Sequence, residues 1–189
     1  MRITGGVLLN RRVICPPGII RPAMDRMRES LFSILQSRMD LNGISFLDLF
    51  SGSGLLSLEA ASRGASLLHA VEKDYGKKAV ILKNFSMLDS LDCEYKLFLN
   101  DAFKFLDRDV HSTYDIIYAD PPFPLSGKEK LLAFFEKNPS FLKDDGYFVV
   151  HIPSEDIPLW SEENDFCIRV LEREYGRSRL LFYKKKAKI

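Results

Sequence analysis

The sequence contains few of the residues from which disulfide frameworks and metal sites are built. It has only three cysteines and three histidines among 189 residues. Cys15, Cys93 and Cys167 lie far apart and form no CxxC pair. Such spacing argues against a disulfide framework or a zinc site and is typical of a reducing cytosol, so we expect no bound metal. The histidines do not cluster, and we interpret His69 and His151 as core or surface residues of strands rather than catalytic ones.

Long apolar segments are also missing. No hydrophobic run approaches the length that crosses a membrane. A secretory signal peptide needs an uninterrupted apolar stretch, and here Arg11 and Arg12 break the N-terminal one before Pro16-Pro17. The chain has no internal repeat and no low-complexity tract. We therefore expect a cytoplasmic monomer without membrane contact.

What the sequence does contain is the composition of an ordinary globular protein with an uneven distribution of charge. Hydrophobic residues make up 46% and charged residues 28%, which suits a full core in one domain. The net charge of +1 hides an asymmetry, because residues 1–40 carry +4, residues 169–189 carry +6 and residues 41–168 carry −9. Basic ends of this kind could form one face that neutralises nucleic-acid phosphates, although Lys184–Lys186 could equally be a solvated tail.

The pattern of apolar residues predicts an N-terminal arm followed by alternating strands and helices. Residues 2–22, punctuated by glycine and proline, are expected to form a short β-rich arm, and a helix should begin near Met24. We place a boundary between this extension, residues 1–40, and a main domain, residues 41–189. The expected strands of the main domain are Ile44–Phe50, Leu67–Glu72, Tyr95–Leu99, Tyr114–Ala119, Tyr147–Ile152, Cys167–Leu171 and Arg179–Tyr183. The expected helices are Leu55–Arg63, Tyr75–Leu88 and Lys128–Glu136.

These elements predict a doubly wound α/β fold. The apolar strands lack clean alternation, which indicates burial on both faces and a mostly parallel sheet. The repeated strand–helix–strand rhythm is that of an open α/β sheet. A short connection through Tyr175-Gly176 joins the last two strands, so we expect these two to be antiparallel.

Asp-Pro-Pro-Phe, residues 120–123, is the most informative motif of the chain. It follows an expected strand, at the edge where open α/β sheets hold their ligands. Its two prolines remove two N–H donors and leave nearby carbonyls free to accept. The Asp120 carboxylate and the Pro121 carbonyl could accept both N–H bonds of a planar amine, with Phe123 stacked on its ring. Taken alone, Asp-Pro-Pro is more often only the end of a strand and the start of a turn.

A glycine-containing loop earlier in the chain supports the chemical interpretation. Asp48-Leu-Phe-Ser-Gly-Ser-Gly54 lies between the first expected strand and its helix, where Gly52 and Gly54 can bring the backbone close to a ligand. The loop does not match a dinucleotide site, because Ser57 stands where the third glycine should be, and the phosphate-loop motif is also missing. Asp48, before the turn, can accept from an ammonium group or an ordered water.

Acidic residues after the next two expected strands fit the remainder of a nucleoside ligand. Glu72 ends the second strand, where an acid reaches a ribose diol. Asn100-Asp101-Ala102 follows the third strand and is placed to contact an adenine edge. A ligand with adenine, ribose, an ammonium and a carboxylate, but no phosphate, is S-adenosylmethionine. Singly, Asp101 could be only a helix cap and Glu72 a surface acid, so the joint pattern carries the prediction.

Together these motifs resemble a known family. Asp-x-Phe-x-Gly-Ser-Gly followed by Asp-Pro-Pro-Phe looks like a class I amino-group methyltransferase. Four further segments restrict the resemblance to a smaller family: Arg2–Gly6, Arg21–Phe32, Leu58–Ala65 and Glu72–Asp74. They resemble the bacterial 16S rRNA guanine-N2 methyltransferases of the RsmD type, and the likeness runs from Arg2 to about Tyr183. The family commonly has two threonines where this chain has Ala23 and Met24, so Asp25 is the expected helix cap.

The resemblance implies a Rossmann-like class I methyltransferase fold, with a mostly parallel seven-stranded sheet and an antiparallel last strand. The implied reaction is methyl transfer from S-adenosylmethionine to the N2 amine of a guanine in 16S rRNA, within a small-subunit particle. The catalytic residues by position are Asp120, Pro121, Pro122 and Phe123. The cofactor-binding residues by position are Asp48, Phe50, Ser51, Gly52, Ser53, Gly54, Glu72, Lys73, Asp101 and Ala102.

Arginines from the two basic ends are the expected RNA contacts. They are Arg11, Arg12, Arg26, Arg28, Arg177 and Arg179. Three other functions remain open at this point. A DNA adenine-N6 or cytosine-N4 methyltransferase would usually need a larger base-reading region, and a protein-glutamine methyltransferase usually has Asn-Pro-Pro-Tyr. A non-catalytic RNA-binding protein could keep the fold without turnover, although the intact acids argue against it.

Overall fold

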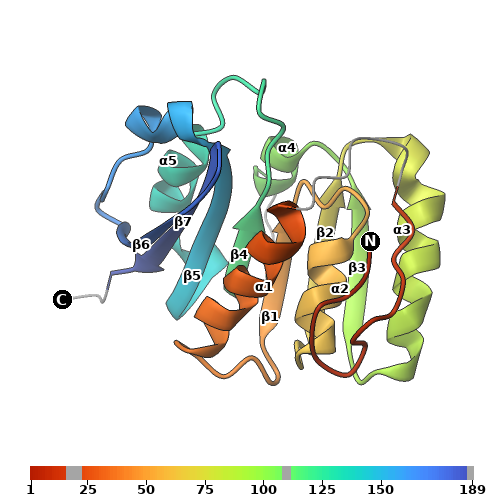
Figure 1. Ribbon diagram of the computed structural model, residues 1–189. Coiled ribbons are helices and arrows are strands. Elements are labelled where there is room, and N and C mark those ends of the chain that lie inside the picture. The colour runs from red at the N-terminus through yellow and green to blue at the C-terminus, as the bar shows by residue number, and fades with distance from the viewer. Residues whose placement is uncertain (16–22, 108–111, 187–189) are drawn as a thin grey trace.

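A single seven-stranded sheet organises the protein. The computed structural model describes residues 1–15, 23–107 and 112–186. The strands follow the order β3-β2-β1-β4-β5-β7-β6 across the sheet (Figure 1). They comprise β1 (Ser45–Leu49), β2 (Leu67–Glu72), β3 (Glu94–Leu99), β4 (Tyr114–Ala119), β5 (Leu142–Pro153), β6 (Cys167–Tyr175) and β7 (Ser178–Lys185). Neighbouring strands are parallel except where β7 pairs with β5 and β6, which confirms the predicted sheet.

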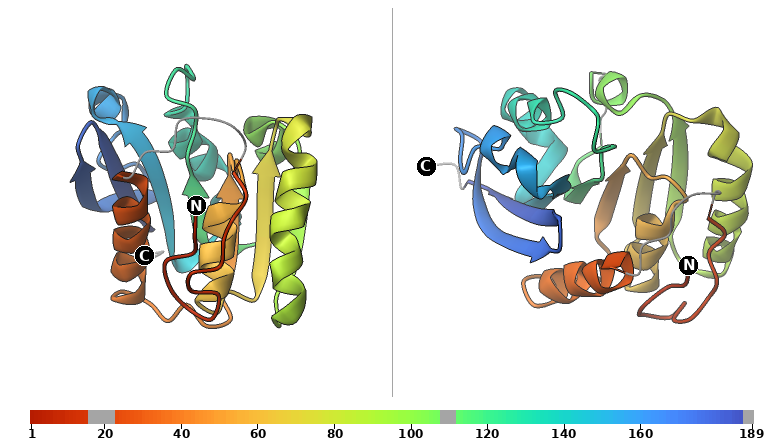
Figure 2. Two further views of the ribbon diagram at one scale, coloured as in Figure 1. Left: turned by 45° about the vertical axis from the view of Figure 1, so that its right-hand side comes forward. Right: turned by 45° about the horizontal axis from the view of Figure 1, so that its top comes forward.

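Helices cover both faces of the sheet and complete three layers. The α-helices are α1 (Ala23–Gln36), α2 (Leu55–Ser62), α3 (Lys78–Phe85), α4 (Ala102–Leu106) and α5 (Lys130–Lys137). The 3₁₀ turns are η1 (Tyr75–Lys77), η2 (Ser86–Ser90), η3 (Pro139–Phe141) and η4 (Ser154–Leu159). Helices α1, α2 and α3 share one apolar cluster with the sheet, and α4 and α5 share a second cluster on the opposite face (Figure 2). No helix in the described ranges is long and apolar enough to span a membrane.

Burial on both faces explains why the central strands lack alternation. All five residues of β1 are buried. Phe46 packs in the cluster of α1 and α2, whereas Leu47 and Leu49 pack in the cluster of α4 and α5. A strand with helices on both sides has no solvent face on which polar residues would be expected.

The N-terminal arm pairs with itself but forms no regular strand within residues 1–15. Its two halves are joined by an antiparallel bridge between Arg2 and Arg12 and by backbone hydrogen bonds from the N–H groups of Ile3, Asn10 and Val13, with a turn between them. The other part of the prediction, residues 16–22, lies outside the described residues. Ile3, Leu8 and Val13 are buried in the same cluster as α1 and the sheet, so the arm is packed on the main body. The boundary placed at residue 40 falls between α1 and β1.

Helix α4 has no counterpart among the predicted elements. Its five residues are too few to show a helical period, and the helix begins because the Asp101 side chain accepts from the N–H groups of Phe103 and Lys104. Residues 75–88, predicted as a single helix, form α3 with the 3₁₀ turn η1 before it and η2 after it. The strand β5 begins five residues earlier than predicted, at Leu142.

Candidate active site

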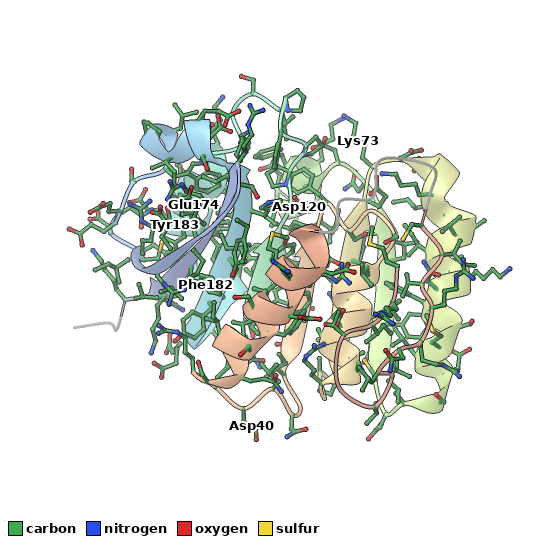
Figure 3. The ribbon with its side chains drawn as sticks, in the orientation of Figure 1. Asp40, Lys73, Asp120, Glu174, Phe182 and Tyr183 are labelled. Atoms are coloured by element: carbon green, nitrogen blue, oxygen red, sulfur yellow. The ribbon has the colours of Figure 1, made fainter. Side chains whose placement is uncertain are left out.

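The carboxyl ends of four neighbouring strands surround a cavity of about 730 Å³. Segments that follow β1, β2, β3 and β4 line it, as open α/β sheets hold their ligands at this edge. Figure 3 shows Lys73 and Asp120 at this end of the sheet. The lining residues are Phe50, Gly52, Val71, Glu72, Lys73, Asp74, Tyr75, Lys77, Asn100, Asp101, Ala102, Asp120, Pro121, Pro122, Phe123 and Leu125.

All four residues of the Asp-Pro-Pro-Phe motif line the cavity. The motif starts where β4 ends, and the backbone N–H of Asp120 donates to the carbonyl of Leu49 at the end of β1 at 3.3 Å. Leu125 N–H donates to the Pro122 carbonyl at 2.8 Å and closes a turn. In the described structure no hydrogen bond occupies the Pro121 carbonyl, which leaves it free to accept from a substrate.

His151 is a buried residue of β5, in agreement with its interpretation as a core residue, but it also contacts Asp120, which the sequence did not indicate. Its Nδ1 lies 2.9 Å from Oδ1 of Asp120, and its ring meets the Phe123 ring edge-on with centroids 5.3 Å apart. The contact follows from strand register, because Ala119 pairs with Val150 and the next residues of the two strands are Asp120 and His151. An alignment of the two predicted strands by register is the signal that could have found it.

A buried lysine fixes the far end of the motif. Lys128 Nζ donates to the Phe123 carbonyl at 2.6 Å and also pairs with Asp156 of η4. The side chain of Lys128 is only 4% exposed. Charge-assisted bonds of this kind are stronger than neutral ones, so the turn that presents Phe123 is held at both ends.

The glycine loop forms the wall of the cavity beside β1. Gly52 lines the cavity, and its N–H donates to Oε2 of Glu72 at 2.8 Å. Gly54 caps α2 with φ of 77°, and a Cβ there would lie 2.5 Å from the Phe85 ring. A side chain at Gly54 is therefore excluded both by backbone conformation and by space. Ser51, Ser53 and Gly54 shape this loop but do not line the cavity.

Asp48 lies beneath the loop and is almost fully buried. Its Oδ2 accepts from the hydroxyl of Ser57 at 2.8 Å and from the Ser57 N–H at 3.2 Å. Burial raises the pKa of Asp48 to about 7, the Ser57 bonds oppose the rise, and the charges of Asp120 and Glu72 add to it. The carboxylate therefore favours a cationic neighbour, because a positive charge would offset the cost of its ionisation.

Glu72 and Asp101 both line the cavity, and both also support its walls. Glu72 Oε1 accepts from the N–H of Asp74 at 2.8 Å, and its Oε2 pairs with Lys77 at 3.3 Å. Asp101 caps α4, and its Oδ2 lies 3.5 Å from Nζ of Lys73. The helix-cap alternative for Asp101 is thus present in the structure, alongside its position at the cavity. A carboxylate has about four lone-pair sites, so each acid retains capacity for a ligand.

The donor set of the cavity fits an adenosyl ligand. Asn100 lines the cavity, and its Nδ2 is buried without a hydrogen-bond partner among the described residues. An unpaired buried donor is costly unless a ligand satisfies it, and an adenine ring offers acceptors. Glu72 and Asp101 would accept from ribose hydroxyls and an exocyclic amine. No cluster of three metal-binding side chains occurs in the described ranges.

The structure separates the predicted RNA contacts into two groups. Arg11, Arg12, Arg26 and Arg177 are exposed, and none forms an ion pair within the described part of the chain. Arg177 lies in the turn between β6 and β7, and its carbonyl accepts from the N–H of Ser154 just beyond β5. That turn therefore lies at the same end of the sheet as the cavity, at the carboxyl ends of the parallel strands.

Two of the predicted arginines are already engaged. Arg28 is 1% exposed and binds Glu59, Asp25 and the Arg2 carbonyl, which contradicts its predicted role at the surface. Its position on α1 faces the arm and α2 rather than solvent. Arg179 is partly exposed and pairs with Glu172 and Glu174.

The basic C-terminal segment does not form a single face with Arg177. The pairing of β7 with β5 runs from Ser178, opposite Pro153, to Lys184, opposite Tyr147, so Lys184–Lys186 lies at the end of the sheet away from the cavity. There Lys184 pairs with Asp145 at 2.9 Å, Lys185 with Asp144 at 2.9 Å and Lys186 with Glu163 at 3.3 Å. The predicted shared surface therefore does not include this tail.

Comparison with known proteins agrees with this geometry. The model of the family described as conserved hypothetical protein 95 matches residues 1–184. Ribosomal RNA small subunit methyltransferase D of Escherichia coli K12 is 32% identical over 157 residues, 82% of this chain and 75% of that protein. Its namesake from Haemophilus influenzae is 29% identical over 87% of this chain and 84% of that one. The solved structure of yhhF from Escherichia coli has a TM-score of 0.85 at 26% identity, covering 100% and 99% of the two chains.

Proposed function

The chain belongs to the conserved hypothetical protein 95 family, and from this premise we propose that it methylates the exocyclic N2 amine of a guanine in 16S rRNA. The methyl donor is S-adenosylmethionine. The membership agrees with the resemblance to the RsmD type that the motifs indicate. The names of the small-subunit methyltransferases among its relatives support the rRNA substrate.

The observation that carries the proposal is the set of free acceptors around Asp120. The Asp120 carboxylate and the unoccupied Pro121 carbonyl both line the cavity, and Phe123 follows on the same turn. Two acceptors from consecutive residues suit an NH2 group on a planar ring. Within the described residues the side-chain partner of Asp120 is His151, which binds Oδ1.

The chain contributes chiefly orientation to the reaction. Bound S-adenosylmethionine would supply an electrophilic methyl group. Asp120 and the Pro121 carbonyl hold the two N–H bonds of the amine, so that its lone pair points at that methyl group. Phe123 stacks on the base, which must leave its helix to reach the cavity. No strong base is required, because the amine sheds a proton once it has become cationic.

Cofactor contacts follow from the residues that line or support the cavity. Glu72 binds the ribose diol, and Asn100, Asp101 and Ala102 contact the adenine edge. Asp48 stabilises the ammonium group, directly or through a water, which lowers its raised pKa. Lys73 closes the rim beside Asp101.

RNA recognition uses the exposed arginines around the cavity and on the arm. Arg26 and Arg177 flank the cavity edge, since Tyr175, beside Arg177, bonds to Ser30 one turn along α1 from Arg26. Arg11 and Arg12 extend the basic surface along the arm. We infer that the substrate is a small-subunit particle in the cytoplasm, where flipped-out bases and folded RNA are presented together.

In vitro methylation tests the proposal against its alternatives. Purified protein is incubated with methyl-labelled S-adenosylmethionine and small-subunit particles from cells that lack the gene, and the nucleosides are then separated. We expect label in N2-methylguanosine of 16S rRNA. Three other results would contradict the proposal. Label in N6-methyladenine or N4-methylcytosine of DNA would indicate a DNA methyltransferase, and label in protein would indicate a protein methyltransferase. Binding of the cofactor without transfer would indicate a non-catalytic RNA-binding protein.

A further inference from the structure

We propose that His151 is a positioning residue, which fixes the Asp120 carboxylate for the substrate amine. The inference rests on the proposed function for its reaction, but its geometry stands on contacts within the chain. His151 does not line the cavity, so any effect on turnover must pass through the lining residues that it touches, and its hydrogen bond is to Asp120.

The contact is between the ends of neighbouring strands. His151 Nδ1 lies 2.9 Å from Oδ1 of Asp120, and the two side chains are 7% and 27% exposed. The more exposed Asp120 is the one that lines the cavity (labelled in Figure 3), while the ring behind it is buried. His151 thus binds one carboxylate oxygen from the protein interior, and the other oxygen remains available to a ligand in the cavity.

The hydrogen-bonding capacities of the two groups set the tautomer. An ionised carboxylate only accepts, so the proton of the shared bond must be on Nδ1. Nε2 is buried without a partner among the described residues. The bond to Asp120 therefore requires a hydrogen on Nδ1.

This bond gives Asp120 a single orientation. The last torsion of an aspartate side chain is broad, so a carboxylate without a fixed partner samples many angles. Holding Oδ1 aims Oδ2 at the cavity, beside the Pro121 carbonyl, where the amine is expected. The His151 ring also meets the Phe123 ring edge-on, but this contact contains no hydrogen bond that would orient Phe123.

His69 offers a matched control within the same sheet. It is also a strand histidine, it is 7% exposed like a core residue, and its Nδ1 lies 2.7 Å from the hydroxyl of Tyr114. Neither His69 nor Tyr114 lines the cavity. A general loss of packing from removing a buried histidine should therefore appear in both variants, whereas a positioning effect should appear only at His151.

Kinetics of three variants provide the first test, on small-subunit particles from cells that lack the gene. His151→Leu should lower kcat roughly 10- to 100-fold, the rate equivalent of a hydrogen bond to a charged group. His151→Asn, whose amide N–H can take the place of Nδ1, should restore most of the rate. His69→Leu should leave kcat unchanged, and S-adenosylmethionine affinity should stay within about twofold in all three, because His151 acts on the methyl acceptor.

A double-mutant cycle isolates the pathway of the effect. In an Asp120→Ala background, His151→Leu should cause no further loss of rate, because the group that it positions is gone. Multiplying losses would show that His151 acts independently of Asp120 and would overturn the inference. A wild-type kcat in His151→Leu, or equal losses in His151→Leu and His69→Leu, would overturn it as well.

Nitrogen NMR of the resting protein tests the geometry without turnover. Long-range proton–nitrogen spectra should show His151 with its hydrogen on Nδ1, and this signal should change in Asp120→Ala while that of His69 does not. Hydrogen on Nε2 and not on Nδ1 would contradict the inference. If the wild-type protein methylates no guanine but the spectra agree, the proposed function has failed while the His151–Asp120 contact stands.

Discussion

At the scale of single residues, Asp48 combines a cost to stability with a proposed role in cofactor binding. Burial raises its pKa from 3.8 to about 7 in the folded protein, so the folded state holds a proton that the unfolded state releases between these values. Stability is therefore lost as the pH rises from about 4 to about 7. Asp48→Asn should remove this loss, and its advantage over the wild type should grow by on the order of 2 kcal/mol between pH 5 and pH 8.

The same substitution should weaken S-adenosylmethionine binding, because the neutral amide cannot balance an ammonium group. Urea unfolding at the two pH values and calorimetry of cofactor binding measure the two effects. An equal stability difference at pH 5 and pH 8 would mean that Asp48 is already ionised at pH 5. Unchanged cofactor affinity would place the ammonium group elsewhere.

Substitutions of Phe123 can distinguish stacking on the substrate base from packing within the turn. Its ring lines the cavity, meets His151 edge-on and lies 6.0 Å from Lys128 Nζ. Phe123→Leu should impair turnover more than Phe123→Tyr, because a flat face is worth roughly 1–3 kcal/mol per stacked base. Single-turnover rates of the two variants on small-subunit particles measure the difference. Equal rates would show that Phe123 only fills space in the turn.

At the scale of elements, one buried carboxylate joins the arm, α1 and α2. Glu59 of α2 is fully buried and accepts from Arg28, Arg63 and both the N–H and the hydroxyl of Thr4. Glu59→Gln should lower the free energy of unfolding by about 3 kcal/mol, because it leaves a buried guanidinium without its main counter-charge.

Urea unfolding measures this loss, and Glu29→Gln is the matched control. Glu29 is an exposed acid on α1 without an ion pair in the described structure, so its replacement should change stability by at most about 0.5 kcal/mol. Equal effects of the two substitutions would show that the Glu59 network does not hold these elements together.

The elements differ in how far the sequence could predict them. The positions of β2 and β4 follow from mostly apolar runs, interrupted by His69 and Asp115, and Glu72 and Asp120 could be predicted because they stand directly at the ends of those runs. Helix α4 was missed because five residues show no period. The contact of His151 with Asp120 could not be predicted, because it is set by the register between strands, which no local pattern contains.

At the scale of the whole molecule, charge along the chain did not predict charge on the surface. The count of basic residues at the two ends is correct, but Arg28 is turned into the core and Lys184–Lys186 lies at the far edge of the sheet in ion pairs. Composition cannot distinguish a solvated arginine from one that completes a buried network. The predicted arginines that are exposed are Arg26 and Arg177, with Arg11 and Arg12 on the arm.

Salt dependence of RNA binding tests this surface. Arg177→Gln should weaken binding to small-subunit particles and lower the log–log salt slope by at most about 0.9 for each phosphate that the variant no longer neutralises. Lys184→Gln, at the opposite end of β7, is the matched control and should keep the wild-type slope. The double variant Arg11→Gln/Arg12→Gln should lower the slope with cofactor affinity unchanged. A wild-type slope in both arginine variants would place recognition on another face.

Mass spectrometry of 16S rRNA nucleosides tests the central claim most directly, in cells that lack the gene and carry either the wild-type protein or Asp120→Ala. We expect one N2-methylguanosine to disappear in the deletion strain and to return only with the wild-type protein, because in the proposed mechanism Asp120 holds the amine that is methylated. Cofactor affinity of purified Asp120→Ala should be near normal. An unchanged set of N2-methylguanosines in the deletion strain, or full restoration by Asp120→Ala, would contradict the account.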